Sequence, residues 1–324
     1  MDTQAALDTQ PRRVGILALP GFALMSYAAT VEPLRAANLL SRRKLYEVTH
    51  FGTAARAAQS SGHAVAPVDA LITEAGPLDY LFVVAGGEPA SYRDDRVFGW
   101  LRRLARTGVT LGGVSGGPVI LAQAGLMAGR RMTVHWEHAA ALAEADPDLL
   151  TERTLYVIDR DRLTCAGGTA PLDLMHALIA MHHGGDFARL VSDWFMHTEV
   201  RPAFGPQRSG LAERVGTANK TALDAVSVME ANIAEPLALA ALARIAGVTP
   251  RQLNRLFTTH VGQTTMGYYA LMRLETARRL LRNSSLTVTE VAMATGFATA
   301  GHFSTRFRAA FGHPPSALRP RQGG

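Results

Sequence analysis

The sequence predicts two domains of different class, an α/β domain over residues 12–200 and an all-helical domain over residues 222–320. Short β-rich apolar runs alternate with helical patterns up to about residue 200, and no strand pattern follows residue 222. Strands followed by a wholly helical block indicate separate domains. The length of 324 residues agrees, because it exceeds what one hydrophobic core usually fills.

Three runs in the first part are typical of strands buried on both faces. They are RVGILAL (13–19), YLFVVAGG (80–87) and VTLGGVS (109–115). The segments 29–40 and 117–127 have helical spacing. This alternation predicts a mostly parallel sheet covered by helices, whose ligands bind at the carboxyl ends of the strands.

Composition marks the ends of these domains. Residues 1–11 are polar and are expected to be a disordered tail without the features of a signal peptide. Residues 201–221 contain two prolines, three glycines and no clear period, and we interpret them as a linker. The single cysteine, Cys165, and the lack of a long apolar run favour a cytoplasmic protein that does not enter the membrane.

The net charge of +6 is confined to the last third of the chain. Residues 221–324 hold 11 Arg, no Lys and 5 acidic residues, so 11 − 5 = +6, and the rest of the chain balances. This is either a solvated basic surface or an electrostatic footprint for nucleic acid.

The helical third contains a repeated pattern. In residues 237–262 a first helix ends near Gly247, and Thr249 and Pro250 open a second one. Threonine is a good N-cap and proline is tolerated at the first helical position. The pattern returns in residues 286–312, after a predicted connecting helix over 265–282. We predict two helix-turn-helix motifs, which together with the charge favour the nucleic-acid interpretation.

Periodicity assigns the faces of the two second helices. Leu253 and Phe257 are expected in the core of the first motif, and Phe303 and Phe307 in that of the second. Arginine can bind guanine and asparagine can bind adenine, so we expect the first motif to carry most sequence specificity and the second mainly to contact phosphates. The candidate DNA-binding residues are Arg251, Gln252, Asn254, Arg255, Thr258, Gly301, His302, Ser304, Thr305 and Arg308.

Residues 222–320 resemble the AraC-type DNA-binding domain, whose closing signature is similar to GFATAGHFSTRFRAAFGHPPSALR. The resemblance implies two recognition helices in successive major grooves on one face of the duplex. Ala300, Gly301 and Thr305 stand where relatives often carry longer polar side chains, which argues against base readout by the second motif.

The segment Gly113-Val114-Ser115-Gly116-Gly117 fits G-x-S-x-G, the spacing of a nucleophile elbow. Its surroundings, GGVSGGPVILAQAGLMAGRRMTVHW, and the later segment CAGGTAPLDLMHALI (165–179) resemble the DJ-1/PfpI superfamily, which implies a flavodoxin-like front domain. This domain followed by an AraC-type tail resembles the GlxA-type transcription regulators, whose members include regulators of arginine, carnitine and glycine betaine catabolism.

Enzymes of the superfamily carry a cysteine on the elbow and an acidic residue nearby. Here Ser115 takes the first position, Ser26 aligns with the second, and His135 is retained. A serine hydroxyl needs a positioned general base, and no carboxylate that would orient His135 is identifiable. We therefore predict no catalytic residues and no enzyme. The alternatives are a hydrolase or hydratase that uses Ser115 and His135, and a constitutive regulator with a vestigial pocket.

The resemblance implies that the elbow region binds a small effector instead. Helix-start N–H groups near Gly116 would favour a carboxylate, and an aromatic ring or Glu88 would favour an amine or quaternary ammonium group. Taken alone, Trp136 is better explained by core packing. The candidate effector pocket comprises Ser26, Tyr27, Gly87, Glu88, Ser115, Gly116, His135 and Trp136.

No metal and no cofactor are expected, since His135 and His138 lack further matched ligands. The family implies double-stranded promoter or operator DNA, a small-molecule effector and RNA polymerase as partners. It also implies a homodimer, and an activator of a catabolic operon.

Overall fold

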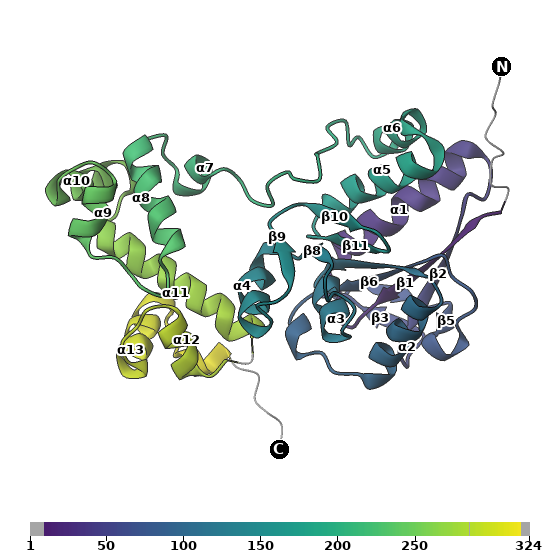
Figure 1. The fold of residues 1–324 in the computed structure, drawn as a ribbon, viewed down its shortest axis with the longest axis horizontal. Coiled ribbons are helices and arrows are strands. Elements are labelled where there is room, and N and C mark those ends of the chain that lie inside the picture. The colour runs from purple at the N-terminus through teal and green to yellow at the C-terminus, as the bar shows by residue number, and fades with distance from the viewer. Residues whose placement is uncertain (1–9, 285, 319–324) are drawn as a thin grey trace. The chain divides into compact units, whose positions relative to one another are not determined.

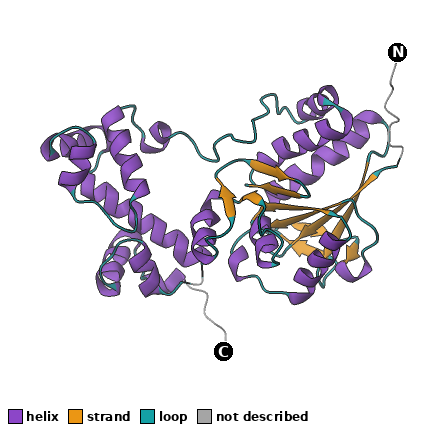
Figure 2. Ribbon diagram, in the orientation of Figure 1, coloured by secondary structure: helices purple, strands orange, loops and turns teal. Residues whose placement is uncertain are grey.

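A computed structural model describes residues 10–284 and 286–318 of the chain. The chain divides into two compact units, Met1–Gln207 (the front unit) and Arg208–Gly324 (the tail unit) (Figure 1). Among the described residues, strands occur in the front unit and the tail unit is helical (Figure 2), so the predicted class of each part is confirmed. Most of the expected tail, residues 1–9, lies outside the described residues.

The front unit is built on a seven-stranded sheet in the order β10-β11-β7-β6-β1-β2-β5. All neighbouring pairs are parallel except β10 with β11, as the buried runs predict. Its strands are β1 Arg12–Ala18, β2 Tyr46–Gly52, β5 Ala70–Leu71, β6 Tyr80–Ala85, β7 Thr110–Ser115, β10 Tyr156–Asp159 and β11 Arg162–Cys165. Two small pairs were not foreseen: β3 Ala57–Gln59 with β4 Val65–Pro67, and β8 Arg131–Thr133 with β9 Leu150–Glu152.

Helices cover both faces of this sheet (Figure 2). The core on one face includes residues of α1, α5 and α6, and the core on the other includes residues of α2, α3 and α4. The helices are α1 Leu24–Ser41, α2 Asp95–Arg106, α3 Gly117–Gln123, α4 Trp136–Ala145, α5 Ala170–His183 and α6 Gly185–Trp194. Short 3-10 turns lie at Ile72–Glu74 and Pro89–Ser91.

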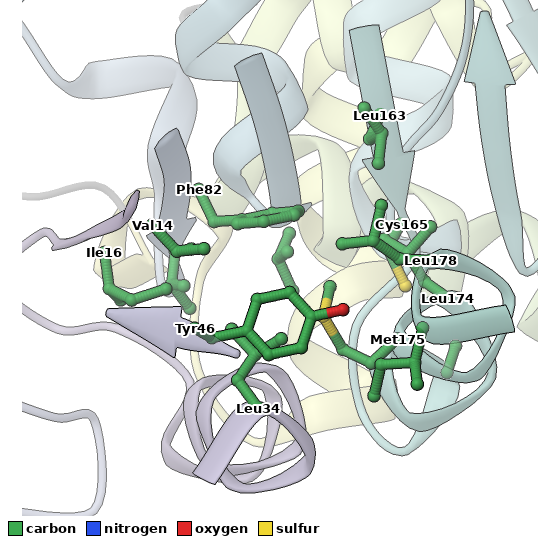
Figure 3. Packing of buried hydrophobic residues seen from close by; sticks show 14 of the residues in the cluster. Val14, Ile16, Leu34, Tyr46, Phe82, Leu163, Cys165, Leu174, Met175 and Leu178 are labelled. Carbon is green, nitrogen blue, oxygen red and sulfur yellow. The ribbon is translucent and has the colours of Figure 1, made fainter. Parts of the chain in front are cut away.

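Alternation along the central strands explains the two cores. In β6, Phe82 and Val84 face the α1/α5 side, whereas Leu81 and Val83 face the α2/α3 side. Figure 3 shows part of the first of these cores, to which Phe82, Cys165 and Tyr46 contribute side chains. Cys165 is fully buried, and burial raises the pKa of its thiol to about 12. It is therefore the inert thiol that its apolar run predicts.

The tail unit contains both predicted helix-turn-helix motifs. Its helices are α7 Leu211–Val215, α8 Lys220–Ala231, α9 Leu239–Ile245, α10 Pro250–Val261, α11 Thr265–Asn283, α12 Val288–Ala294 and α13 Ala300–Phe311, followed by a 3-10 turn at Pro315–Leu318. The Thr249 side chain caps α10, as expected, and Thr299 caps α13 in the same way.

The range 201–221 is more structured than its composition suggests. It contains the division between the two units, the helix α7 and the start of α8. Residues 201–207 belong to the front unit and are hydrogen-bonded to other parts of it. In the described parts of the chain, no helix has the length and apolar character to cross a bilayer.

Candidate DNA interface and elbow site

The two recognition helices expose the faces that periodicity assigns to DNA. Leu253 and Phe257 of α10 are fully buried, as are Phe303 and Phe307 of α13. Eight of the ten candidate residues are exposed, and they lie on the opposite faces: Arg251, Gln252, Arg255, Thr258, Gly301, His302, Thr305 and Arg308. Asn254 and Ser304 are half-buried.

Some of these side chains already have a structural role. The Asn254 side-chain oxygen accepts a hydrogen bond from the Thr265 backbone N–H at 3.0 Å, at the start of α11. A bidentate contact to adenine needs that oxygen as well as the amide nitrogen. The adenine-reading role predicted for Asn254 therefore does not fit this geometry. The Gln252 oxygen is similarly occupied, because it accepts from the Thr249 backbone N–H at 2.9 Å.

The arginines are different. Arg251, Arg255 and Arg308 are exposed and have no ion pair within the described part of the chain. Their guanidinium groups are thus available for guanine or phosphate. Arg306 of α13 is also exposed, and the sequence reasoning missed it because it lies at the flank of the apolar stripe. A count of every arginine near the stripe edge would have included it.

The elbow has the geometry that its sequence predicts. Ser115 ends β7 with a φ of +60° and is only 6% exposed. A non-glycine residue in this conformation is strained, and such strain is concentrated at functional sites. The following helix packs close to the sheet, because a Cβ at Gly117 would lie 2.0 Å from the Val83 carbonyl oxygen.

The loop Gly167-Gly168 joins two of the predicted site residues. Ser26 is fully buried, and its hydroxyl accepts a hydrogen bond from the Gly168 N–H at 2.8 Å. A Cβ built at Gly167 would lie 2.7 Å from the Ser115 Cβ, so this backbone passes directly over the elbow. The sequence reasoning did not place these glycines in the site, although the segment CAGGTAP carries the signal.

His135 also contacts the elbow. Its backbone N–H donates to the Ser115 carbonyl at 3.5 Å, and its Nδ1 accepts from the Glu137 N–H at 3.3 Å, which caps α4. Burial lowers the pKa of His135 from its usual value, which favours the neutral ring. A neutral imidazole that accepts at Nδ1 carries its proton on Nε2. Nε2 is then a donor, which does not suit it to remove a proton from a serine hydroxyl.

Gly87, Glu88 and Gly116 meet at the same end of the sheet. The Gly116 N–H donates to the Ala85 carbonyl at 3.0 Å, so it is already paired and does not supply the anion contact that the sequence suggests. A Cβ at Gly116 would lie 2.9 Å from Pro89, which brings the Gly87-Glu88 turn beside the elbow. Glu88 is half-buried.

The two aromatic candidates differ. Trp136 is 37% exposed, and its ring centroid lies 5.3 Å from that of His135. The prediction that Trp136 packs in the core is therefore wrong. Tyr27 instead packs on Phe22, and its hydroxyl is 2.9 Å from His50 Nδ1. Trp136 therefore adjoins His135, whose backbone is bonded to Ser115, whereas Tyr27 is directed to Phe22 and His50.

Comparisons with known proteins identify the family of each of the two units. The DJ-1/PfpI family matches residues 12–181, and a helix-turn-helix domain matches residues 242–321. The HTH-type transcriptional regulator GlxA of Rhizobium meliloti is 46% identical over 96% of this chain and 97% of its own. The HTH-type transcriptional regulator CdhR of Pseudomonas aeruginosa is 41% identical over 94% of this chain and 90% of its own.

Two solved structures are similar. An AraC family transcriptional regulator from Pseudomonas putida covers 57% of this chain and 100% of its own, with a TM-score of 0.53 and 26% identity. A ThiJ/PfpI family protein from Pseudomonas syringae covers 76% of this chain and 95% of its own, with a TM-score of 0.52 and 20% identity, and shows the fold alone. The chain therefore belongs to the GlxA-type transcriptional regulators, in which a DJ-1/PfpI family domain precedes an AraC-type helix-turn-helix domain.

Proposed function

We propose that this DNA-binding regulator activates a catabolic operon when a small carboxylate with an amine or quaternary ammonium group binds beside Ser115. Amino acids, betaines and carnitine-like molecules have this chemistry. The support is the family resemblance, the exposed ring of Trp136 next to His135, and the position of Glu88 directly before Pro89, which lies against Gly116. An aromatic face and a carboxylate both attract an ammonium group.

The proposal assigns most base readout to α10. The observation that supports this assignment is the pair Arg251 and Arg255. Their guanidinium groups are exposed and lie one helical turn apart on the face away from the core. Arginine binds guanine bidentately, which makes this pair suited to direct readout. The second motif offers Arg308 for phosphates. We further propose that the regulator acts in the cytoplasm as a homodimer and recruits RNA polymerase at its promoter.

In this proposal the elbow binds the effector but catalyses no reaction. Two features support the absence of catalysis. Ser115 stands where enzymes of the superfamily carry a cysteine, and the His135 ring presents a donor rather than a base. Serine without a base is a poor nucleophile. The strained φ of Ser115 favours the competing candidate, an enzyme with an active elbow, so the two are tested together.

Calorimetry on the full-length protein tests the ligand class, with glycine betaine, L-carnitine and L-arginine as probes. We expect one of them to bind, and Trp136→Ala to weaken that binding by about 3- to 10-fold, as loss of a cation–π contact predicts. Trp194→Ala, which removes a 49% exposed tryptophan elsewhere in the front unit, is the control and leaves the affinity unchanged. Failure of every probe to bind contradicts the ligand class.

Mass spectrometry of the same samples tests whether the elbow leaves the bound compound chemically unchanged. The bound compound is expected to be recovered unchanged, and Ser115→Ala is expected to leave DNA binding intact. A covalent adduct on Ser115, or product that disappears in Ser115→Ala, supports the enzyme instead. Ser227→Ala, an exposed serine of α8, is the matched control.

A further inference from the structure

Residues 201–207, the last segment of the front unit, form a strap that is anchored to the rest of that unit, although their composition is that of a loose linker. We propose that this strap couples the elbow site to the DNA-binding unit, with Arg201 and Gln207 as positioning residues. The inference rests on the proposed function, because it concerns how the same elbow site is connected to DNA binding.

Arg201 fixes the first end of the strap. Its Nε and Nη2 donate to Asp173 Oδ2 at 3.0 Å and 2.6 Å, and its backbone N–H donates to Oδ1 at 2.9 Å. Asp173 is fully buried in the first turn of α5, and His197 Nε2 lies 2.8 Å from its Oδ1. A buried carboxylate is strongly unfavourable without such partners, which holds the arginine in place.

The Arg201 anchor adjoins the elbow. Arg201 Nη2 also donates to the Thr169 hydroxyl at 3.0 Å. Thr169 follows Gly168, which is bonded to Ser26, and Gly167, which packs against Ser115. A ligand that displaces this glycine loop therefore acts on the segment to which Arg201 is bound.

Gln207 fixes the other end. Its amide nitrogen lies 2.7 Å from the Thr154 carbonyl oxygen, 3.0 Å from the Thr133 hydroxyl and 3.1 Å from the Val134 carbonyl oxygen. Thr133 ends β8, and the next residue but one is His135, whose backbone is bonded to Ser115. Both ends of the strap thus connect to the elbow within a few residues.

The middle of the strap is also paired. The Leu155 N–H donates to the Ala203 carbonyl at 2.8 Å, and the Gly205 N–H to the Pro202 carbonyl at 2.8 Å. Gly205 is buried against the Leu155 side chain, which would lie 3.0 Å from a Cβ built there. By contrast the Phe204 side chain is 79% exposed, so it offers a control in the same segment.

Anchoring determines how long the tether to the tail unit is. With Gln207 bound, only residues 208–210 separate the anchor from α7, a reach of about 10 Å of extended chain. With Gln207 released and Arg201 still bound, residues 202–210 are available, a reach of about 30 Å. The effective concentration of a tethered domain falls as about the −3/2 power of linker length, about fivefold here.

The elbow and the strap then influence each other in both directions. A ligand that binds more tightly when the strap is anchored favours the short tether, and by linkage the anchored strap favours that ligand. The tail unit would then search for its second DNA half-site over a smaller volume.

Residue-resolved hydrogen exchange on the full-length protein tests the anchor. The reporters are the Leu155 and Gly205 amides, each protected by a bond in the strap. We expect Gln207→Ala to speed their exchange at least about fivefold, the effect of losing one hydrogen bond from the closed state. Phe204→Ala is expected to leave both rates within about twofold of wild type. Equal rates in Gln207→Ala and wild type would overturn the anchor.

Two further measurements test the coupling. His135→Ala removes a side chain at the elbow that is not part of the strap, and should speed exchange at Leu155 by about threefold or more. Glu144→Ala, at an exposed site of α4, the helix that His135 caps, should leave that rate unchanged. In selection from random DNA, wild type should prefer one half-site spacing, and Gln207→Ala should keep the half-site sequence but accept a wider range of spacings. Unchanged exchange in His135→Ala, or an unchanged spacing preference in Gln207→Ala, contradicts the coupling. If wild type selects no DNA, the proposed function fails, and the exchange rates still decide whether the strap is anchored.

Discussion

The two helix-turn-helix motifs of the tail unit share one framework. Positions fifty residues apart correspond: the caps Thr249 and Thr299 precede α10 and α13, and Phe257 and Phe307 are buried at matching points. Both helices have 12 residues and end at a glycine in the left-handed conformation. Nothing in this framework distinguishes a base-reading motif from a supporting one.

The differences lie on the outer face and at the turn. Arg251 and Arg255 of the first motif correspond to Gly301 and Thr305 of the second. The turn of the second motif is held by Arg273, whose Nε donates to the Thr295 carbonyl at 2.7 Å and whose Nη2 donates to the Gly296 carbonyl. This difference is the basis on which we propose base reading by the first motif and phosphate contacts by the second.

The largest expected effect is at the turn glycines, which both have positive φ. A Cβ at Gly296 would lie 2.6 Å from Pro236 Cδ and 2.8 Å from the Ile233 carbonyl oxygen. A Cβ at Gly247 would have none of the described residues within 4 Å, apart from its own chain neighbours. Gly247→Ala should lower the free energy of unfolding by about 1–2 kcal/mol, the left-handed penalty alone. Gly296→Ala should cost about 3 kcal/mol or more, because backbone must also move. Urea unfolding measures the free energy of unfolding of both variants. Equal losses would contradict the close packing of the Gly296 turn against Pro236 and Ile233.

The next largest effect is expected for Arg273→Ala. It removes a half-buried guanidinium group, whose pKa is lowered by burial, and leaves the carbonyls of Thr295 and Gly296 without that donor. We expect a loss of about 2–3 kcal/mol in the free energy of unfolding of the tail unit. Arg282→Ala, at an exposed position of the same helix, should change it by less than about 0.5 kcal/mol. A similar loss in both variants would mean that Arg273 does not hold the second motif.

Arg255→Ala tests the difference in readout. If Arg255 reads a guanine, binding should weaken by about 1–3 kcal/mol at one base pair of the site. Thr305→Ala, the corresponding change in the second motif, should cost less than about 0.5 kcal/mol at any base pair. Competition with single-base-pair variants measures this. A uniform loss over all sequences in Arg255→Ala would make it a phosphate contact and would remove the proposed asymmetry.

The smallest expected effect is in Arg308→Ala. As a phosphate contact it should weaken binding by a similar factor on every sequence, and should reduce the dependence of log K on log salt by about one. Titrations at several salt concentrations check this. A loss confined to one base pair would show that the second motif reads sequence as well.

The features that the sequence predicts best are those set by local rules. Periodicity identifies the buried Leu253, Phe257 and Phe303, and the cap and proline rules place the start of α10 at Pro250. The turn at Ser115 follows from its glycine-rich surroundings. Each of these depends on residues within one or two turns of the chain.

What sequence reasoning missed depends on contacts between distant residues. The Asn254 oxygen is occupied by Thr265, eleven positions away, and Gly168 reaches Ser26 across 142 positions. The strap illustrates this best, because Arg201 and Gln207 have ordinary linker neighbours but bind Asp173 and Thr154. No periodicity reports such pairings.

Selection from a random DNA pool with the purified full-length protein at modest salt tests the central claim most directly. That claim is that the tail unit reads sequence through the first motif while Ser115 plays no chemical part. We predict one enriched sequence, which Ser115→Ala and Thr305→Ala also select and from which Arg255→Ala loses a single base preference. Absence of enrichment, or an Arg255→Ala variant that selects the full wild-type sequence, would contradict the account.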